Sequence, residues 1–178
     1  MKPIIRTFTG KEINPFEIRL GEICIDDIAH GLALCNRFAG QTRYPISVAQ
    51  HSVYCSRLCG GSLQALLHDA SEAYLGDVTK WVKQTPEMAQ FRIIEHNLEK
   101  LIFQKFGCEY DIKSEVEEAD RIMVRFEGLQ GFGSSFFINH PNYPLLTKRD
   151  TQRIGSWKFI NWRKAEEMFL NCYRELTW

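Results

Sequence analysis

The stretch LLHDASEAYLGD, residues 66–77, gathers side chains that could do chemistry. His68 and Asp69 are adjacent, Glu72 follows one helical turn later, and Asp77 comes directly after a glycine. Imidazole and carboxylate groups bind divalent transition metals, and a carboxylate that is not a ligand can act as a general base. The stretch is therefore either half of a metal site or an acidic surface in water.

Periodicity within the stretch favours the acidic surface. A helix predicted over 63–75 places most leucines and alanines on one face and the histidine and first two acids on the opposite face. A polar face of this kind usually lies in water. Ala65 and Leu75 share the polar face, however, and both are unusual choices for open solvent.

Two more polar residues fall on the apolar faces of other predicted helices. His51 lies on the apolar face of a helix predicted over about 47–59, where a histidine is more often a packed core residue than a ligand. Asp120 lies in the apolar stripe of a helix predicted from 114 to about 128. Burial of an unpaired carboxylate is costly, so this group must be paired with an arginine, protonated or bound to a metal.

Taken together, these residues supply two imidazoles and two carboxylates from three separate helices. A mixed nitrogen and oxygen set suits one borderline divalent transition-metal ion of the Co, Mn or Zn type. Positions remain for water and for substrate oxygens. The combination indicates an open catalytic site.

The elements that must position these residues are predicted to form one mainly helical domain over residues 1–178. Turn signals and weak alternation in residues 1–25 predict a short hairpin. Residues 130–160 are rich in Gly, Phe, Asn and Pro, and a connection of this length is often a lid or an interface. Helices are predicted over 26–35, 47–59, 63–75 with Gly76 as its end, 86–106, 114–128 with a capping box at 114–117, and 161–176.

The composition excludes several classes of function. Formal net charge is zero and the pI is about 7, so no overall field attracts a nucleic acid polymer or an acidic membrane. No apolar run has the length of a membrane helix, and the N-terminus lacks the apolar core of a secretion signal. The six cysteines form no CxxC pair and are expected as reduced thiols of a cytoplasmic protein.

The order H…HD…D resembles the HD-domain superfamily of metal-dependent phosphohydrolases. The matching segments are SVAQHS with His51, LLHDASEAYLGD with His68 and Asp69, and EEADRIM with Asp120. HDxSE followed by GD and a short lysine-bearing stretch is similar to bacterial HD-type 5'-deoxynucleotidases and to small phage dATP triphosphohydrolases. The resemblance covers roughly residues 26–127. It implies an all-α, HD-type helical bundle in which those four residues ligate one metal ion.

The resemblance also implies roles for residues around the metal. Glu72 matches the catalytic carboxylate, and Asp77 matches a second acidic residue beside the substrate. The substrate contacts implied are Arg43, Lys80 and Lys83 for the phosphates, and Tyr44 and Ile46 for the base.

Several functions fit this pattern. The favoured one is hydrolysis of deoxynucleoside triphosphates, of the dATP type, in control of the nucleotide pool, because the chain is small and only eight residues separate Arg43 from His51. Arg43, Lys80 and Lys83 could serve three phosphates. A 5'-deoxynucleotidase acting on monophosphates is the alternative enzyme. An alarmone hydrolase fits less well, since such enzymes usually carry HDxxED and Ala73 follows Glu72 here. A non-catalytic HD-fold nucleotide-binding module and a helical protein with a metal-free ion-pair network also remain open. The Phe-rich stretch GFGSSFFINHPNYP indicates a subunit contact and a homo-oligomer.

Overall fold

The structure, a computed structural model, describes residues 3–133, 143 and 145–178. The Phe-rich stretch at 131–144, on which the expected subunit contact rests, lies mostly outside these residues.

The chain begins with the predicted hairpin. Strands β1 (Ile5–Arg6) and β2 (Glu12–Ile13) pair antiparallel, with Ile5 opposite Ile13. The hairpin is fastened to the first helix through Asp27, whose carboxylate accepts hydrogen bonds from the backbone N–H and the hydroxyl of Thr9 at 2.7 and 2.9 Å.

The next two helices confirm the sequence prediction. Helix α1 (Ile25–Leu34) is followed by the 3₁₀ turn η1 (Phe38–Gly40) and then by α2 (Val48–Leu58). The Ser47 side chain accepts a hydrogen bond from the Gln50 N–H and caps α2. Because α2 is buried on nearly all sides, its polar residues must find partners inside the protein.

The single helix predicted over 63–75 is wrong. The structure has α3 (Leu63–Leu67) and α4 (Glu72–Leu75), separated by turns at 68–71. Backbone hydrogen bonds of the tighter i to i+3 kind, such as Ala70 N–H to the Leu67 carbonyl, replace the α-helical pattern here. Gly76 ends α4 as predicted, with a φ of +82°. The break directs the side chains of His68 and Asp69 independently of a helical wheel.

Helix α5 (Lys80–Lys83) was not predicted as an element. The helix predicted over 86–106 is present as the 3₁₀ turn η2 (Pro86–Met88) followed by α6 (Ala89–Phe106). Pro86 occupies the first turn, where its missing N–H costs nothing.

Helix α7 (Ser114–Phe132) is longer than predicted. Its predicted capping box is wrong, because Lys113 is the N-cap residue and makes no side-chain cap hydrogen bond, so Ser114 is already inside the helix. Part of the unassigned segment forms α8 (Lys148–Ile154), which does begin with a capping box, between Thr147 and Asp150.

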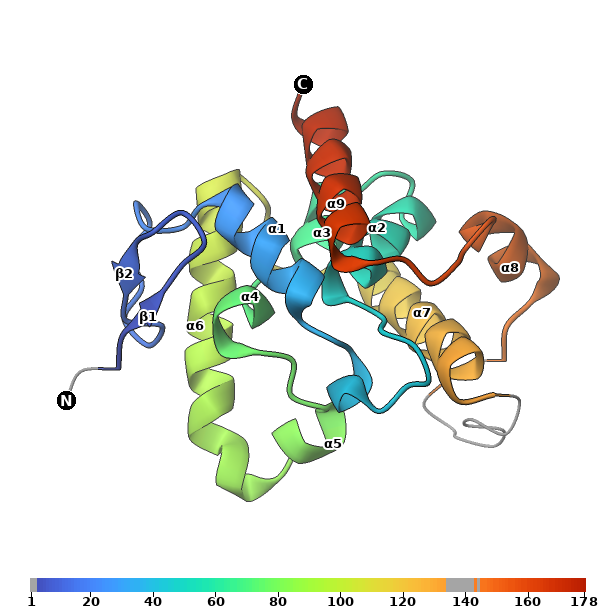
Figure 1. The fold of residues 1–178 in the computed structure, drawn as a ribbon, viewed down its shortest axis with the longest axis horizontal. Helices are drawn as coiled ribbons and strands as arrows, with labels where there is room; N and C mark the ends of the chain where they lie inside the picture. Colours follow the sequence, from blue (N-terminus) through green and yellow to red (C-terminus); the bar gives the residue numbers. More distant parts are fainter. Residues whose placement is uncertain (1–2, 134–142, 144) are drawn as a thin grey trace.

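Helix α9 (Trp162–Thr177) confirms the last prediction. The Asn161 side chain accepts a hydrogen bond from the Lys164 N–H at its start. Helices α1, α2 and α9 pack on one another in the middle of the molecule, with α6 along one side and α7 along the other (Figure 1). Helix α2 contacts both α3 and α7, so α2 lies between the two elements that carry the other predicted ligands. Within the described part of the chain, no helix combines the length and apolar character needed to cross a bilayer.

Close packing between α1 and α4 gives a test of this arrangement. A Cβ atom added at Gly31 would lie 2.8 Å from the Ala73 carbonyl oxygen and 2.9 Å from its Cβ, so Gly31→Ala must push the two helices apart. We expect the free energy of unfolding to fall by about 1–3 kcal/mol in urea titrations. Gly21→Ala is the control, because nothing lies within 4 Å of a Cβ at that position. Equal stability of the two variants would show that α1 and α4 are not packed this tightly.

Candidate metal centre

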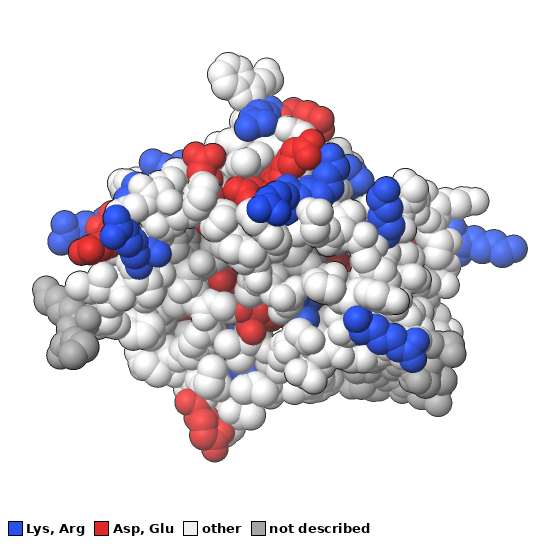
Figure 2. Space-filling model, in the orientation of Figure 1, with Lys and Arg blue, Asp and Glu red and all other residues white. Residues whose placement is uncertain are grey.

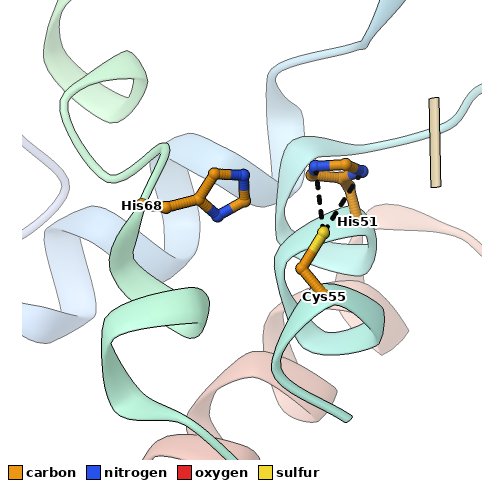
Figure 3. A group of neighbouring side chains, drawn as sticks. All are labelled: His51, Cys55 and His68. Atoms are coloured by element: carbon orange, nitrogen blue, oxygen red, sulfur yellow. Dashed lines mark hydrogen bonds between the residues drawn. The ribbon is translucent and has the colours of Figure 1, made fainter. Parts of the chain in front are cut away.

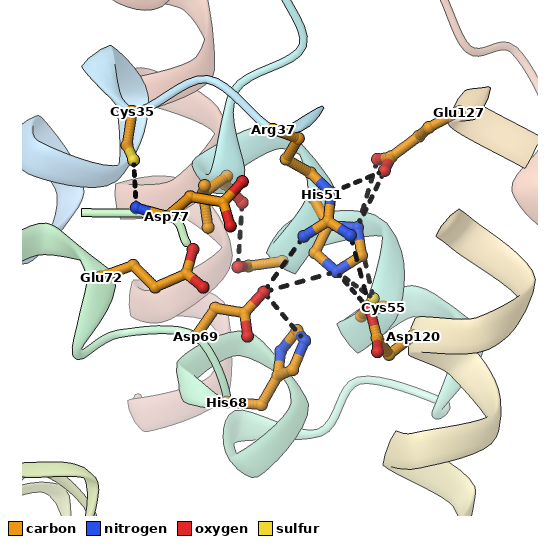
Figure 4. Close-up of polar contacts among 12 residues, drawn as sticks. Cys35, Arg37, His51, Cys55, His68, Asp69, Glu72, Asp77, Asp120 and Glu127 are labelled. Carbon is orange, nitrogen blue, oxygen red and sulfur yellow. Dashed lines mark hydrogen bonds and ion pairs between the residues drawn. The ribbon is translucent and has the colours of Figure 1, made fainter. Parts of the chain in front are cut away.

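Glu127 fixes the orientation of His51. Both residues are 0% exposed, and the two carboxylate oxygens of Glu127 lie 3.2 and 3.1 Å from His51 Nδ1. Nδ1–H therefore donates to the carboxylate, and Nε2 faces the opposite way with its lone pair. Since His51 belongs to α2 and Glu127 to α7, the contact also joins two helices (Figure 4).

A backbone carbonyl orients His68 in the same manner. Nδ1 of His68 lies 2.8 Å from the carbonyl oxygen of Ala65. Nε2 is buried and has no hydrogen-bond partner among the residues that the structure describes. Such a nitrogen is costly to bury, and here the ring faces His51, with the two ring centroids 5.3 Å apart. Both imidazoles thus offer Nε2 to the same small space, which is the donor arrangement that a metal ion requires.

Asp69 and Asp120 reach this space from the turn after α3 and from α7. Asp69 Oδ2 lies 3.3 Å from His68 Nε2 and 3.6 Å from His51 Nε2, and Asp120 Oδ1 lies 3.2 Å from His51 Nε2. The four predicted ligands are therefore brought together. Metal–ligand bonds of about 2.0–2.2 Å separate neighbouring ligand atoms of a tetrahedral site by about 3.3–3.6 Å, so the observed separations suit one ion.

Arg37 contacts both aspartates. Its guanidinium nitrogens lie 3.3 Å from Asp69 Oδ2 and 3.7 Å from Asp120 Oδ1, while Nε lies 3.0 Å from Glu127 Oε2. The ion pair with an arginine, which was the alternative explanation for Asp120, is therefore present in part. The shortest contact of Arg37 is nevertheless with Glu127. Because its contacts with Asp69 and Asp120 are longer, these two carboxylates can also contact a metal ion.

The two aspartates remain ionised. Burial raises the pKa of each carboxyl, but the adjacent imidazoles and the charge of Arg37 outweigh burial, and both pKa values lie below the usual range. Two anionic carboxylates beside two imidazoles can accept a divalent cation.

Cys55 lies beside the same nitrogens. Its Sγ is 3.3 Å from His51 Nε2. His51, Cys55 and His68 are all buried, each offers a ligand atom within 4.8 Å of the others, and this group could hold a metal ion. Because Cys55 lies on the apolar face of its predicted helix, sequence analysis predicts a packed thiol at this position.

Residues 68, 69 and 72 do not form a face in water, which periodicity alone favoured over the metal site. His68 is 8% exposed and Glu72 5% exposed, and the side chain of Asp69 is 21% exposed. The helical wheel fails because the helix breaks at His68. Ala65, the apolar residue that was unusual for a wet face, is fully buried.

A cavity of about 710 Å³ opens beside the candidate metal centre, which is enough for a nucleotide. Apolar walls come from Phe38, Trp81, Val124 and Phe132. Figure 2 shows charges of both signs interspersed over one face, with acidic atoms in a hollow near its middle. The charged residues that line the cavity are Asp69, Glu72, Asp77, Glu95, Glu99 and Asp120, and Arg37, Lys80, Lys83 and Arg92.

Glu72 lines this cavity with its carboxylate next to Lys83. Lys83 Nζ lies 3.7 Å from Glu72 Oε1 and 2.8 Å from Glu95 Oε1, so α6 holds the lysine that faces the predicted catalytic acid. Burial and the charges of Asp69 and Asp77 raise the pKa of Glu72 well above its usual range, and Lys83 opposes them. The second Glu72 oxygen is buried without a hydrogen-bond partner among the described residues. This carboxylate is positioned to accept a proton.

Asp77 and Lys80 line the cavity as predicted. The backbone N–H of Asp77 points to Cys35 Sγ at 3.2 Å. Burial raises the pKa of the Asp77 carboxyl, although Arg37 and Lys83 oppose this. Lys80 is exposed at the rim.

The other three predicted substrate contacts are not brought to the cavity. Arg43 is exposed and its backbone N–H donates to the Gly131 carbonyl at 3.1 Å. Tyr44 is 57% exposed, with its ring 4.7 Å from that of Phe159, and Ile46 is a fully buried core residue. None of the three is among the described residues that line the cavity.

Arg37 and Phe38 line the cavity instead of Arg43 and Tyr44. Phe38 and Ala39 both have positive φ values, +56° and +51°, in the left-handed region that non-glycine residues avoid. Such a backbone costs about 1–3 kcal/mol per residue and persists where the surroundings enforce it. Here it presents Arg37 to the carboxylates and the Phe38 ring, edge-on to Phe132 with 5.5 Å between centroids, to the cavity wall.

Comparison with known proteins gives relatives whose names carry no activity. No protein-family model matches the sequence. The chain is 36% identical over 125 residues to the "Uncharacterized protein YfdR" of Escherichia coli strain K12, which covers 69% of each chain. The chain belongs to the family of YfdR. A YfdR-family relative from Rhodobacter capsulatus, "Uncharacterized protein RCAP_rcc00048", is 32% identical over 145 residues, or 73% of this chain and 74% of its own. Neither name states a ligand or a reaction. The function must therefore be inferred from the geometry of the site.

Sequence reasoning missed three charged residues of the site in this chain. Glu127 lies seven residues after Asp120, two turns along the same helical face, and that spacing could have revealed it. Arg37 comes directly before the residues FAG, and nothing in the sequence pattern distinguished it from Arg43 as a phosphate contact. Glu95 lies within a long amphipathic helix, and only the fold brings it to Lys83.

Loss of the Glu127 charge tests how His51 is oriented. Glu127→Gln keeps the shape of the side chain but weakens the hold on His51 and Arg37, and outer partners of this type typically contribute 10–100-fold to metal affinity. We expect the zinc dissociation constant, measured by competition with a chromophoric chelator, to rise by about 10–100-fold. Glu118→Gln, on the exposed side of the same helix, is the control and should match the wild type. Unchanged affinity in Glu127→Gln would refute the orienting role.

Glu99, a half-buried acid that lines the cavity, gives a pH prediction. Burial, with the charges of Glu95 and Asp69, raises the pKa of Glu99 from 4.5 to about 7. The folded protein thus binds this proton more tightly than the unfolded chain does, and the stability due to it is lost as pH rises through about 7.

Glu99→Gln should therefore stabilise metal-free protein at pH 8, by about 1–2 kcal/mol after solvent screening, and have little effect at pH 4. Urea unfolding at both pH values measures the difference, with the exposed Glu117→Gln as control. The same change in stability at both pH values would contradict the prediction.

Proposed function

We propose that this chain is a metal-dependent phosphohydrolase that acts on deoxynucleoside 5'-phosphates. The observation that supports the proposal is a pair of buried imidazoles, each with Nδ1 fixed by another group and Nε2 directed toward two aspartates, at the wall of a nucleotide-sized cavity. A donor set of this kind at an accessible cavity is typical of catalytic rather than structural metal sites.

Four residues would hold the ion, namely His51, His68, Asp69 and Asp120. A bound divalent transition-metal ion supplies a water of lowered pKa and polarises a phosphoryl oxygen. The charge of the ion would offset the two aspartates, which would otherwise repel an anionic substrate.

The other side chains of the cavity have roles that follow from their contacts. Glu72 would accept the proton of the attacking water, since the residue lines the cavity and its carboxyl is not among the groups closest to the two imidazoles. Lys83, held by Glu95, would stabilise the negative charge that grows on the phosphoryl oxygens. Arg37 would take the phosphate-binding role first given to Arg43, because its guanidinium lies at the aspartates. Asp77 would orient the sugar or protonate the leaving oxygen.

The balance of charge in the cavity bears on the number of phosphates. Among the described residues that line it, six are acidic and four are basic. Arg37 already contacts three carboxylates, Lys83 contacts two, and the Arg92 guanidinium donates to the backbone carbonyls of Lys83 and Thr85. A triphosphate tail carries more negative charge than these cations can offset. The cavity therefore favours a deoxynucleoside monophosphate over the triphosphate that the sequence favoured.

An enzyme of this kind would act in the cytoplasm, where its nucleotide substrates are found. The Phe-rich stretch at 131–144 is the sequence feature that favours a homo-oligomer. A nucleotide-binding module without catalysis is the second candidate. The presence of Glu72, buried at 5% exposure and facing the cavity, favours the enzyme.

A panel of nucleotides tests the function. Purified protein with Co²⁺, Mn²⁺ or Zn²⁺ is incubated with the four deoxynucleoside monophosphates and triphosphates and with AMP and ATP, and the products are separated by chromatography. We expect deoxynucleoside and inorganic phosphate from the monophosphates. Release of triphosphate from dATP would favour the triphosphohydrolase, while tight binding without any product would favour the binding module.

Glu72→Gln tests the proton acceptor. Loss of a general base typically lowers kcat by about 10²–10⁴-fold, and we expect such a loss with metal content unchanged, because Glu72 is not a proposed ligand. Gln84→Ala, another cavity residue, is the control. Full activity in Glu72→Gln would remove Glu72 from the mechanism, whereas loss of both metal and activity would make it a ligand.

A further inference from the structure

Cys55 is the one thiol among the described residues that lies within the candidate metal centre. It follows His51 by four residues on α2, so the two side chains project from the same face of the helix (Figure 3). Its residue is 0% exposed, and its Sγ lies 3.3 Å from His51 Nε2 and within 4.8 Å of the ligand nitrogen of His68.

Packing alone accounts for only part of this position. Cys55 does contact the apolar cluster between α2, α3 and α7, and a buried cysteine often acts as a small hydrophobic side chain with a weak S–H donor. A packed thiol needs only apolar neighbours. Here the sulfur meets the one imidazole nitrogen that the Glu127 contact leaves available.

The crowding around that nitrogen points to a cation. His51 Nε2 has Cys55 Sγ at 3.3 Å, Asp120 Oδ1 at 3.2 Å and Asp69 Oδ2 at 3.6 Å. A single ring nitrogen makes one hydrogen bond, so it cannot satisfy all three neighbours. A metal ion beside this nitrogen would relieve the crowding, because its ligands direct lone pairs to the ion and not to one another. Zn–N and Zn–S bonds of about 2.0–2.3 Å separate neighbouring ligand atoms by about 3.3–3.8 Å, which agrees with the distance between Cys55 Sγ and His51 Nε2.

A second atom supports the same conclusion. His68 Nε2 is buried, has no hydrogen-bond partner among the described residues and belongs to the same three-residue group. Arg37 supplies positive charge to Asp69 and Asp120. A guanidinium has no empty coordination position, however, so the sulfur and this nitrogen cannot donate their lone pairs to it as ligands. Only an ion with open coordination positions serves both.

We propose that Cys55 is a further ligand of the metal ion and that its sulfur directs the site toward thiophilic ions. This inference rests on the metal site of the proposed function. On binding, the Cys55 S–H bond breaks, the proton passes to solvent, and the sulfur electron pair forms the bond to the ion, with no change in oxidation state. Thiolate ligands favour Zn²⁺ and related ions over Mn²⁺ and Mg²⁺, which prefer oxygen. The Cys55 side chain therefore selects zinc-like metals from the set that the imidazoles and carboxylates alone would accept.

Cobalt spectroscopy tests the proposal without any substrate. Apo-protein prepared with a chelator is titrated with Co²⁺, and the near-ultraviolet sulfur-to-cobalt charge-transfer band is recorded together with the visible ligand-field bands. We expect both in the wild type. Cys55→Ala and Cys55→Val should lose the charge-transfer band, and the ratio of zinc to manganese affinity should fall by tenfold or more, since even outer partners of a site contribute about 10–100-fold.

Matched controls are Cys59→Ala, one turn further along, and Cys35→Ala, on the opposite side of the cavity, both of which should keep the band. Cys55→Val fills the space of the thiol and so avoids a packing defect. The thermal unfolding temperature of each variant shows whether it has lost only a ligand or has also lost its fold. The wild-type spectrum alone is decisive if both variants unfold.

The outcomes are distinguishable. Visible cobalt bands without a charge-transfer band in the wild type, or a band that persists in Cys55→Val, would overturn the role of Cys55 and leave the proposed function standing. Failure to bind cobalt or zinc at all would overturn the metal site itself, and with it the proposed function.

Discussion

One wholly buried carboxylate organises the centre. Glu127 is 0% exposed and has no access to water, so its charge must be compensated within the protein. It is compensated by Nδ1–H of His51 and by the guanidinium of Arg37, which belong to α2 and to the loop after α1. Three elements are thereby held at one point, and two functional side chains are given a single orientation. The left-handed backbone at Phe38 and Ala39 is the local cost of delivering Arg37 to that point.

The break between α3 and α4 is the second constraint, and it explains how adjacent residues serve one centre. In a continuous helix His68 and Asp69 would diverge by about 100° and both would face away from the apolar stripe. Tight turns at 68–71 let His68 donate back to Ala65 while Asp69 reaches both imidazoles. Helix α4 then begins at Glu72, and its close contact with α1 at Gly31 sets where that carboxylate enters the cavity.

Sequence patterns predicted the parts of this protein that depend on burial and failed where they depend on direction. His51 and Asp120 could be found because a polar residue in an apolar stripe demands an explanation, and α2 and α7 do carry them to one place. For residues 68, 69 and 72 the helical wheel alone favoured a face in water, against the metal site that the whole set of residues indicated, because a wheel assumes an unbroken helix. Arg37, Glu95 and Glu127 could not be ranked above other charged residues, since their importance comes from partners 12 to 90 positions away that only the fold brings close. Cys55 was hidden for the opposite reason, because a thiol on an apolar face fits the core pattern perfectly well.

Charge explains why these features belong together. The cavity is lined by more acids than bases among the described residues, and its two best-placed cations are already surrounded by carboxylates. Such a cavity repels a phosphate unless a divalent ion offsets the acids, so under the proposed function substrate binding depends on metal binding. An ion that stays bound between substrates would meet this condition at every turnover. A soft sulfur ligand in addition to the nitrogen and oxygen donors strengthens the hold on a zinc-like ion and not on Mg²⁺, the ion that nucleotides carry with them. Retention of its own metal, rather than borrowing one from the substrate, is therefore the physical condition on which an acid-rich phosphate site of this kind depends.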